Sequence, residues 1–285
     1  MNSPVRNYLS LVKFSHTIFA MPFALIGFFL AVQHGYTFSW KLFVFVLLCM
    51  IFARSAAMAF NRWIDSDIDA KNPRTANREI PKGIISANNV LFFVLFNAAA
   101  FIITAFFINQ LCFFLSPVAL LVTLGYSATK RFTALSHFVL GLGLSLAPVG
   151  AYLAVADEFN LIPVLLSLTV LCWVSGFDII YALQDEEFDK QQKLFSVPAW
   201  LGKKNALMLS TFIHLLCIPL LILIGVDGHF AIFYWAGATI FILLLIYQHL
   251  LVKPNDLSKV NLAFFTLNGI ASILFASFVL IDLWK

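Results

Sequence analysis

The chain alternates long apolar runs with short polar segments. Nine of the runs come close to the ~20 residues that a helix needs to cross the hydrocarbon core of a bilayer. They cover residues 14–33, 40–60, 90–108, 111–127, 135–155, 161–181, 206–225, 229–251 and 259–282. A segment in lipid must satisfy its own backbone hydrogen bonds, and a helix does so within one segment. The pattern therefore predicts an all-α membrane protein with about nine transmembrane helices.

Basic residues gather at one set of helix ends. Of the 18 Lys and Arg residues, only Lys41 and Lys285 fall at the opposite ends, and Arg54 lies inside an apolar run. Lys and Arg accumulate on the cytoplasmic side of a membrane. We therefore expect a multi-pass protein of the inner (cytoplasmic) membrane, with a cytoplasmic N-terminus. Both long polar loops, 61–89 and 182–205, then face the cytoplasm.

The composition also indicates a membrane protein, and it gives no sign of a nucleic-acid partner. The chain is 61% hydrophobic and 11% charged, with a mean hydropathy of +0.93, whereas a soluble domain is about 25% charged. The net charge of +4 is modest, and no separate basic block indicates a nucleic-acid partner. The four cysteines lie in apolar runs without Cys-x-x-Cys spacing, so neither zinc nor a disulfide framework is indicated.

The polar loop 61–89 opens with oxygen-bearing side chains at helical spacing. Asn61, Asp65 and Asp69 stand at i, i+4 and i+8, which places them on one face of a helix. Neighbouring carboxylates repel each other and favour a cation between them. Mg²⁺ takes oxygen ligands and is often held by one or two carboxylates together with substrate phosphates. Because Arg74 and Arg78 follow and suit phosphate oxygens, the sequence predicts a Mg²⁺–diphosphate site at a membrane surface.

The second polar loop resembles the first. Asp185 and Asp189 follow Asp65 and Asp69 at a constant offset of 120 residues. We interpret this as an internal repeat of four helices, with the ninth helix outside it. The two Asp-x-x-x-Asp pairs would then surround one central cavity, within a single transmembrane domain that covers residues 1–285.

Two charged residues lie deeper in the predicted helices. Arg54 precedes Asn61 by seven residues, and Asp178 precedes Asp185 by seven, so each lies two turns inward on the same face. An ionisable residue inside a membrane indicates function by default. Two interpretations stay open: Arg54 pairs with Asp178, or it binds the carboxylate of an aromatic acid. In the second case Asp178 orients this acceptor or takes up a proton.

A third polar cluster lies midway along the chain. Tyr126 stands one turn before Lys130, and Arg131 follows directly. These basic residues either anchor the helix end in the cytoplasm or bind phosphate, and Tyr126 and Lys130 are spaced to reach one phosphate together.

Together these motifs resemble those of the UbiA superfamily of intramembrane aromatic prenyltransferases, and in particular its 4-hydroxybenzoate polyprenyltransferase-like branch. The resemblance covers the chain from about residue 13 to the last apolar run. It is carried by Asn61-xxx-Asp65-xxx-Asp69, Arg74-Thr75-Ala76-Asn77-Arg78 with Pro81-x-Gly83, Tyr126-xxx-Lys130-Arg131, and Asp178-xx-Tyr181-Ala182-xx-Asp185-xxx-Asp189. It implies nine helices around a central cavity, with Mg²⁺ and an isoprenyl diphosphate at its cytoplasmic mouth.

The resemblance also implies roles for individual residues. Metal and diphosphate would be held by Asn61, Asp65, Asp69, Asp185 and Asp189. Lys130 and Arg78 would contact phosphate, and Arg54 matches the position proposed for the aromatic acid. We add Arg74, Tyr126, Arg131 and Tyr181 as candidate substrate-binding residues, and Asp65, Asp178 and Asp185 as candidate catalytic residues.

The expected activity is Mg²⁺-dependent transfer of a polyprenyl group from polyprenyl diphosphate to a ring carbon of an aromatic acid, in quinone biosynthesis. One alternative is the same chemistry with a naphthoate-like acceptor, as in a menaquinone pathway. A secondary transporter would share the repeats and the intramembrane charges, and a flux assay in vesicles separates transport from synthesis. A CDP-alcohol phosphotransferase is a further alternative, but its denser Asp-Gly-Ala-Arg signature is absent from this sequence.

Overall fold

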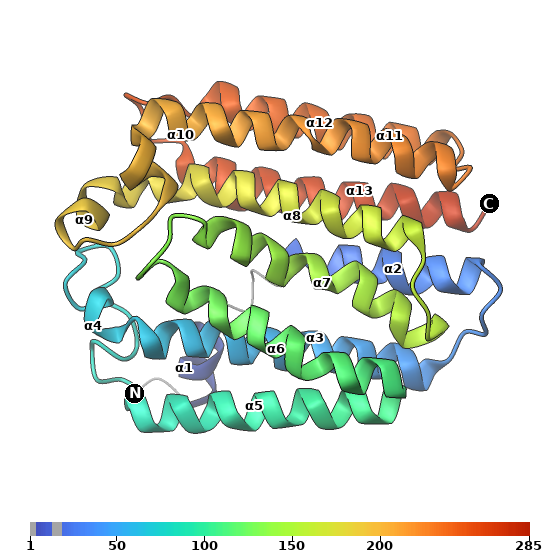
Figure 1. The fold of residues 1–285 in the computed structure, drawn as a ribbon, viewed down its shortest axis with the longest axis horizontal. Helices are drawn as coiled ribbons and strands as arrows, with labels where there is room; N and C mark the ends of the chain where they lie inside the picture. The colour runs from blue at the N-terminus through green and yellow to red at the C-terminus, as the bar shows by residue number, and fades with distance from the viewer. Residues whose placement is uncertain (1–3, 13–18) are drawn as a thin grey trace.

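The computed structural model describes residues 4–12 and 19–285, and its regular secondary structure is helical (Figure 1). The first half contains α1 (Pro4–Leu11), α2 (Met21–Gln33), α3 (Trp40–Ile64), α4 (Ser66–Asp69), α5 (Ala87–Ile108) and α6 (Gln110–Thr129). The second half contains α7 (Ser136–Ala156), α8 (Leu161–Ala182), η2 (Leu183–Asp185), α9 (Glu186–Gln191), α10 (Val197–Leu215), α11 (Cys217–Asp227) and α12 (Ile232–Leu251). The π-helical turn η3 (Leu262–Leu267) leads into the last helix, α13 (Asn268–Leu283).

The predicted apolar runs correspond to helices. In the described part of the chain, eight helical stretches are long and apolar enough to cross a membrane, and α2 is a shorter apolar helix of 13 residues. The predicted run 14–33 starts among residues 13–18, which lie outside the described residues, as does Lys13 of the basic set. The all-α fold class is therefore confirmed.

Side-chain caps set the start of several long helices. In each case a Ser or Asn oxygen accepts a hydrogen bond from a backbone N–H two or three residues further on, which stabilises a helix by about 1 kcal/mol. The capping residues are Ser39, Ser86, Asn109, Asn160 and Ser196. These caps mark where polar residues end the loops and the apolar runs begin.

The second polar loop is more helical than its composition suggests. The predicted loop 182–205 contains η2, α9 and the first turns of α10, which begins at Val197 rather than near residue 206. Ser196 caps α10, and Pro198 suits its first turn. The polar residues Lys203, Lys204 and Asn205 hide this part of the helix from a hydropathy profile. Gly202, with φ of +76°, bends α10 at this point.

The long helices run roughly side by side, and their polar ends coincide (Figure 1). The short helices α4 and α9 lie at the same end of the bundle, although 120 residues separate them. Helices α2 and α7 approach closely at Gly27, where a Cβ atom would lie 2.0 Å from the carbonyl oxygen of Pro148. This packing helps to place α7, and with it the polar residues at its start, beside α8.

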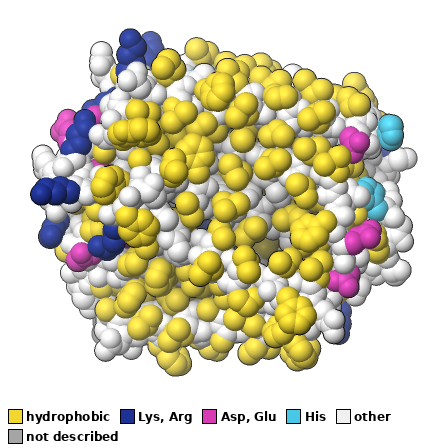
Figure 2. Space-filling view, viewed as in Figure 1, with side chains coloured by type: hydrophobic (Ala, Val, Ile, Leu, Met, Phe, Trp, Pro, Cys, Tyr) yellow, Lys and Arg dark blue, Asp and Glu magenta, His cyan; other side chains and the backbone are white. Residues whose placement is uncertain are grey.

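The surface has the pattern of a protein embedded in lipid. Apolar side chains cover the middle of the face seen in Figure 2, and Lys and Arg gather at the end where α4 and α9 lie. Asp, Glu and His residues mark the other end in this view. The basic end is the one that the charge distribution of the sequence assigns to the cytoplasm.

Candidate active site

A cavity of about 1170 Å³ opens among α3, α5, α6, α7 and α8. One end, which we call the mouth, is lined by Asn61, Asp65, Asp69, Arg74, Arg78, Lys130, Asp185 and Asp189. The rest, which we call the channel, is lined mainly by apolar side chains of α3, α5, α6 and α7. The cavity therefore joins a highly charged opening to an apolar interior.

Both acidic motifs stand where a long helix gives way to a short one. Asp65 separates α3 from α4 with φ and ψ of −93° and 5°, and Asp185 precedes α9 with −104° and 4°. The same backbone geometry at an offset of 120 residues supports the internal repeat. Helical hydrogen bonding continues across the first break, because Asp65 N lies 3.1 Å from Asn61 O and Asp69 N lies 2.7 Å from Asp65 O. The predicted stacking of these three residues is therefore kept although the helix itself ends at Ile64.

Basic side chains of the mouth lie directly on three of the carboxylates. Lys130 Nζ lies 2.6 Å from Asp65 Oδ2, and Arg78 NH1 lies 2.7 Å from Asp69 Oδ1. The Arg74 guanidinium donates to Asp185, with Arg74 Nε 3.0 Å from Asp185 Oδ1. Charge-assisted contacts of this kind hold the groups that suit phosphate next to the groups that suit a metal.

The two halves of the chain meet at Asp185. Asn72 and Arg74 belong to the first polar loop, and both donate hydrogen bonds to the Asp185 carboxylate, with Asn72 Nδ2 at 3.2 Å from Oδ1. Asn72 Oδ1 in turn accepts from the backbone N–H of Arg74 at 2.9 Å. The Arg74 guanidinium also donates to Tyr181 Oη at 3.0 Å and lies 5.3 Å above the Tyr181 ring. These contacts bring the predicted metal and phosphate residues of both loops to one place.

The donor set of the mouth fits Mg²⁺. Within residues 4–12 and 19–285, no three His, Cys, Asp or Glu side chains stand close enough to enclose a metal ion by themselves. Mg²⁺ commonly needs only one or two carboxylates, because substrate phosphates and water complete its octahedron. The carboxylates and the Asn61 amide offer oxygen atoms, and Asp65 Oδ1 is buried without a hydrogen bond. Arg131 NH2 lies 3.7 Å from this oxygen.

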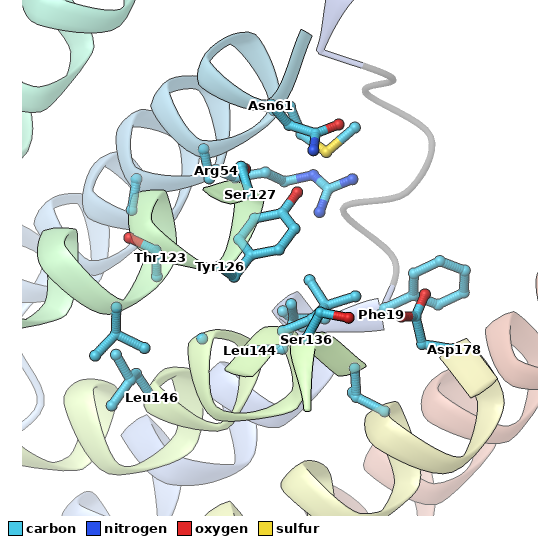
Figure 3. A pocket seen from close by; sticks show the side chains of 18 of the residues that line it. Phe19, Arg54, Asn61, Thr123, Tyr126, Ser127, Ser136, Leu144, Leu146 and Asp178 are labelled. Atoms are coloured by element: carbon cyan, nitrogen blue, oxygen red, sulfur yellow. The ribbon is translucent and has the colours of Figure 1, made fainter. Parts of the chain in front are cut away.

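Arg54 and Asp178 occupy the junction of mouth and channel. Figure 3 shows Arg54 reaching into the pocket from α3 beside Tyr126, while Asp178 lies across the pocket on α8. Asp178 Oδ2 lies 2.7 Å from His137 Nδ1, within hydrogen-bonding distance. The structure thus gives Asp178 a partner other than Arg54, which weakens the interpretation of a purely structural pair.

Arg131 lies away from the cavity. Its guanidinium donates to the carbonyl oxygen of Ile64 and to Asp67 Oδ1, the latter at 3.2 Å, and it is not among the residues that line the cavity. A cation at the C-terminal end of α3 stabilises that end of the helix. Arg131 therefore stabilises the end of α3, next to the break at Asp65. Its partner Asp67 is exposed to solvent.

Three residues of the site were not predicted from the sequence: Asn72, His137 and Ser196. Asn72 binds Asp185, His137 binds Asp178, and Ser196 Oγ donates to Asp189 Oδ2 at 2.7 Å. Each contact joins segments that do not follow each other in a single helix, so residue spacing carries no signal for it. Only Ser196 had a visible cue, as a cap before Val197-Pro198.

The chain is similar to proteins of one known family. Residues 20–270 match the model of the UbiA prenyltransferase family. A 4-hydroxybenzoate octaprenyltransferase of Aliivibrio salmonicida is 28% identical over 240 residues, which are 84% of this chain and 83% of the relative. One of Tolumonas auensis is 30% identical over 228 residues, 80% of this chain and 79% of the relative.

Solved structures show the same fold. The apo structure of a UbiA homologue from Aeropyrum pernix K1 has a TM-score of 0.84 and 30% identity, and the match covers 94% of this chain and 98% of the homologue. A UbiA homologue from Archaeoglobus fulgidus bound to DMAPP and Mg²⁺ has a TM-score of 0.72 and 22% identity, with 98% and 99% covered. This multi-pass membrane protein therefore belongs to the UbiA prenyltransferase family.

Proposed function

We propose that this protein transfers a polyprenyl group from its diphosphate to a ring carbon of an aromatic acid of the 4-hydroxybenzoate kind, in quinone biosynthesis. The observation that carries the proposal is the single cavity, which joins the charged mouth to the apolar channel with Arg54 and Asp178 at the junction. The relatives named 4-hydroxybenzoate octaprenyltransferase support the acceptor class. The homologue bound to DMAPP and Mg²⁺ supports the donor and the metal.

The mouth suits the diphosphate of the donor. Bound there by oxygen atoms of Asp65, Asp69 and Asp185, Mg²⁺ would supply Lewis-acid neutralisation of the leaving group. Arg78 and Lys130 add positive charge where negative charge develops as the C–O bond breaks. Their contacts with carboxylates hold them in place before the donor arrives.

The junction suits an aromatic acid. The Arg54 guanidinium can bind a carboxylate through two parallel hydrogen bonds, and Asp178 can accept from a ring hydroxyl. A ring carbon then forms a C–C bond to the allylic carbon, and that ring carbon loses its proton. The face of Tyr126 stabilises positive charge on the allylic group, and the apolar channel keeps water away from it.

The charge distribution orients the reaction in the cell. The mouth lies at the end where Lys and Arg gather, so we place it at the cytoplasmic face of the inner membrane, with a cytoplasmic N-terminus. Mg²⁺ and the aromatic acid, which are both water-soluble, would enter there. The prenyl tail would stay within the bilayer.

The test is a product analysis. Purified protein is incubated with Mg²⁺, prenyl diphosphates of several lengths and a panel of benzoates and naphthoates, and the extracted lipids are analysed by mass spectrometry. We expect a Mg²⁺-dependent prenylated 4-hydroxybenzoate. Prenylation of naphthoates alone would move the protein to the menaquinone-type alternative, and vesicle flux without any product would favour a transporter.

Gly150 of α7 is predicted to set the tail length. It lines the channel far from the start of α7, and a Cβ atom there would meet nothing within 4 Å. A Leu side chain at this position would occupy space that a long tail needs, and such overpacking costs about 1–3 kcal/mol. Gly150→Leu should therefore lower kcat/KM for long donors about tenfold or more and leave short donors unaffected.

The matched control is Gly125→Leu. Gly125 also has open space around its Cβ position, but it does not line the cavity. This variant should keep the wild-type preference among donors of different length. An equal loss for short and long donors in Gly150→Leu would contradict the placement of the tail in the channel.

Metal binding should depend on pH through Asp69. Burial raises the pKa of Asp69 to about 6, because a carboxyl group shielded from water holds its proton more tightly. Above that pH the group is an anion that can bind a metal, and below it the proton competes. At pH 5 the apparent affinity for Mg²⁺ should be about tenfold weaker than at pH 8, as measured by Mg²⁺ titration of activity. In Asp69→Asn this pH dependence should flatten, and an unchanged dependence would exclude Asp69 as its source.

A further inference from the structure

His137 contacts the carboxylate of Asp178, the residue that we place next to the aromatic acceptor. Its Nδ1 is 2.7 Å from Asp178 Oδ2, and its Nε2 is 3.3 Å from the backbone nitrogen of Val197. The His137 side chain is 5% exposed and that of Asp178 is 20% exposed. Both residues line the cavity, so His137 supports Asp178 from the more enclosed side.

The contacts of His137 define which nitrogen carries the proton. The N–H of Val197 can only donate, so Nε2 must accept. In a neutral imidazole the proton then sits on Nδ1, which donates to Asp178 Oδ2. In the described part of the chain no group donates to the other oxygen, Oδ1. The arrangement therefore fixes Asp178 as a hydrogen-bond acceptor with one oxygen left for a ligand.

The support for Asp178 and the support for Asp189 come from the same turn. Ser196, directly before Val197, donates through Oγ to Asp189 Oδ2 at 2.7 Å and caps α10. Two consecutive residues thus hold the proposed acceptor side through His137 and the proposed metal side through Asp189. The start of α10 therefore contacts residues of both the junction and the mouth.

We propose that His137 is a positioning residue, which holds Asp178 so that Oδ1 accepts a hydrogen bond from the ring hydroxyl of the aromatic acceptor. The inference rests on the proposed function and adds a requirement to it, namely that the acceptor carries a hydrogen-bond donor on the ring. 4-Methoxybenzoate keeps an electron-donating oxygen but lacks the donor. It should therefore be a much poorer acceptor than 4-hydroxybenzoate, because it offers no hydrogen-bond donor to Asp178 Oδ1.

The experiment compares KM and kcat for both substrates in variants of His137. His137→Phe removes the donor to Asp178, and the acceptor KM should rise about tenfold, with donor KM and Mg²⁺ dependence changed less than about twofold. His137→Gln can still donate to Asp178 and accept from Val197, so it should return the acceptor KM to within about threefold of wild type. His137→Asn is too short to span both partners and should resemble His137→Phe, which keeps the test valid if the Phe variant fails to fold.

The control is His34→Phe. His34 Nδ1 lies 2.9 Å from Tyr152 Oη, and His34 does not line the cavity, so its loss should leave both KM values unchanged. Equal increases of donor and acceptor KM in the His137 variants, or failure of Gln to restore the acceptor KM, would overturn the inference while wild-type turnover upholds the proposed function. A wild-type protein that prenylates no aromatic acid would overturn both.

Discussion

The Asp65→Asn protein is expected to lose prenyl transfer by about a thousandfold while it stays folded in the membrane. Asp65 is 1% exposed, stands at the break between α3 and α4, and has one oxygen without a hydrogen bond. A metal that neutralises a leaving group contributes several kcal/mol to the transition state, and each 1.36 kcal/mol corresponds to a factor of ten in rate. Asn has nearly the same shape and can still contact Asn61 and Lys130, so the fold should survive.

The measurement is the Mg²⁺-dependent rate of product formation, together with the thermal stability of the purified variant. Asp67→Asn is the matched control, because Asp67 lies two residues further on with a side chain that is 62% exposed and paired with Arg131. An exposed ion pair contributes little, so this control should keep its activity within about twofold. Substantial Mg²⁺-dependent turnover in Asp65→Asn would rule out the metal role of this residue.

The second large effect is expected at Arg54. Arg54→Ala should raise the KM for the aromatic acid about tenfold to a hundredfold and leave the KM for the prenyl diphosphate nearly unchanged. A hydrogen bond to a charged group contributes about 1.5–3 kcal/mol, which corresponds to that range of affinity. Arg54 projects into the pocket at the junction, two turns deeper in α3 than Asn61, so it lies away from the diphosphate.

Arg54→Lys separates charge from shape. Lys keeps the positive charge but lacks the planar fork that binds both carboxylate oxygens, so it should restore only part of the acceptor affinity. Steady-state kinetics with each substrate varied in turn distinguishes the two KM values. Equal losses for donor and acceptor in Arg54→Ala would contradict the assignment of Arg54 to the acceptor.

Local spacing in the sequence predicted the part of the site that follows one helical register from α3 into α4. Asn61, Asp65 and Asp69 keep their common face because the i to i−4 hydrogen bonds continue through the break. The offset of 120 residues correctly paired the breaks at Asp65 and Asp185, since both residues adopt the same backbone conformation. The membrane-spanning helices followed from hydropathy because lipid leaves few alternatives to a helix.

Contacts between segments that are distant in the chain could not be predicted from the sequence. Asn72 binding to Asp185 and His137 binding to Asp178 depend on how the helices pack, which no residue spacing encodes. Arg131 looked equivalent to its neighbour Lys130, but both residues lie in the turn that follows α6, where their side chains reach different partners. One therefore binds Asp65 in the mouth and the other the end of α3. The start of α10 was missed because the polar residues 203–205 separate its apolar first residues from the longer apolar run that follows.

We propose that acidic residues from the two halves of the chain serve one metal–diphosphate site. The most direct measurement is anomalous scattering from Mn²⁺, which replaces Mg²⁺ at oxygen sites, in crystals grown with a non-hydrolysable prenyl diphosphate analogue. We predict metal in the mouth, bound to Asp65 or Asp69 and, directly or through the diphosphate, to Asp185 or Asp189, with the tail in the channel. Metal outside the cavity, or metal and diphosphate held by one half alone, would contradict the account.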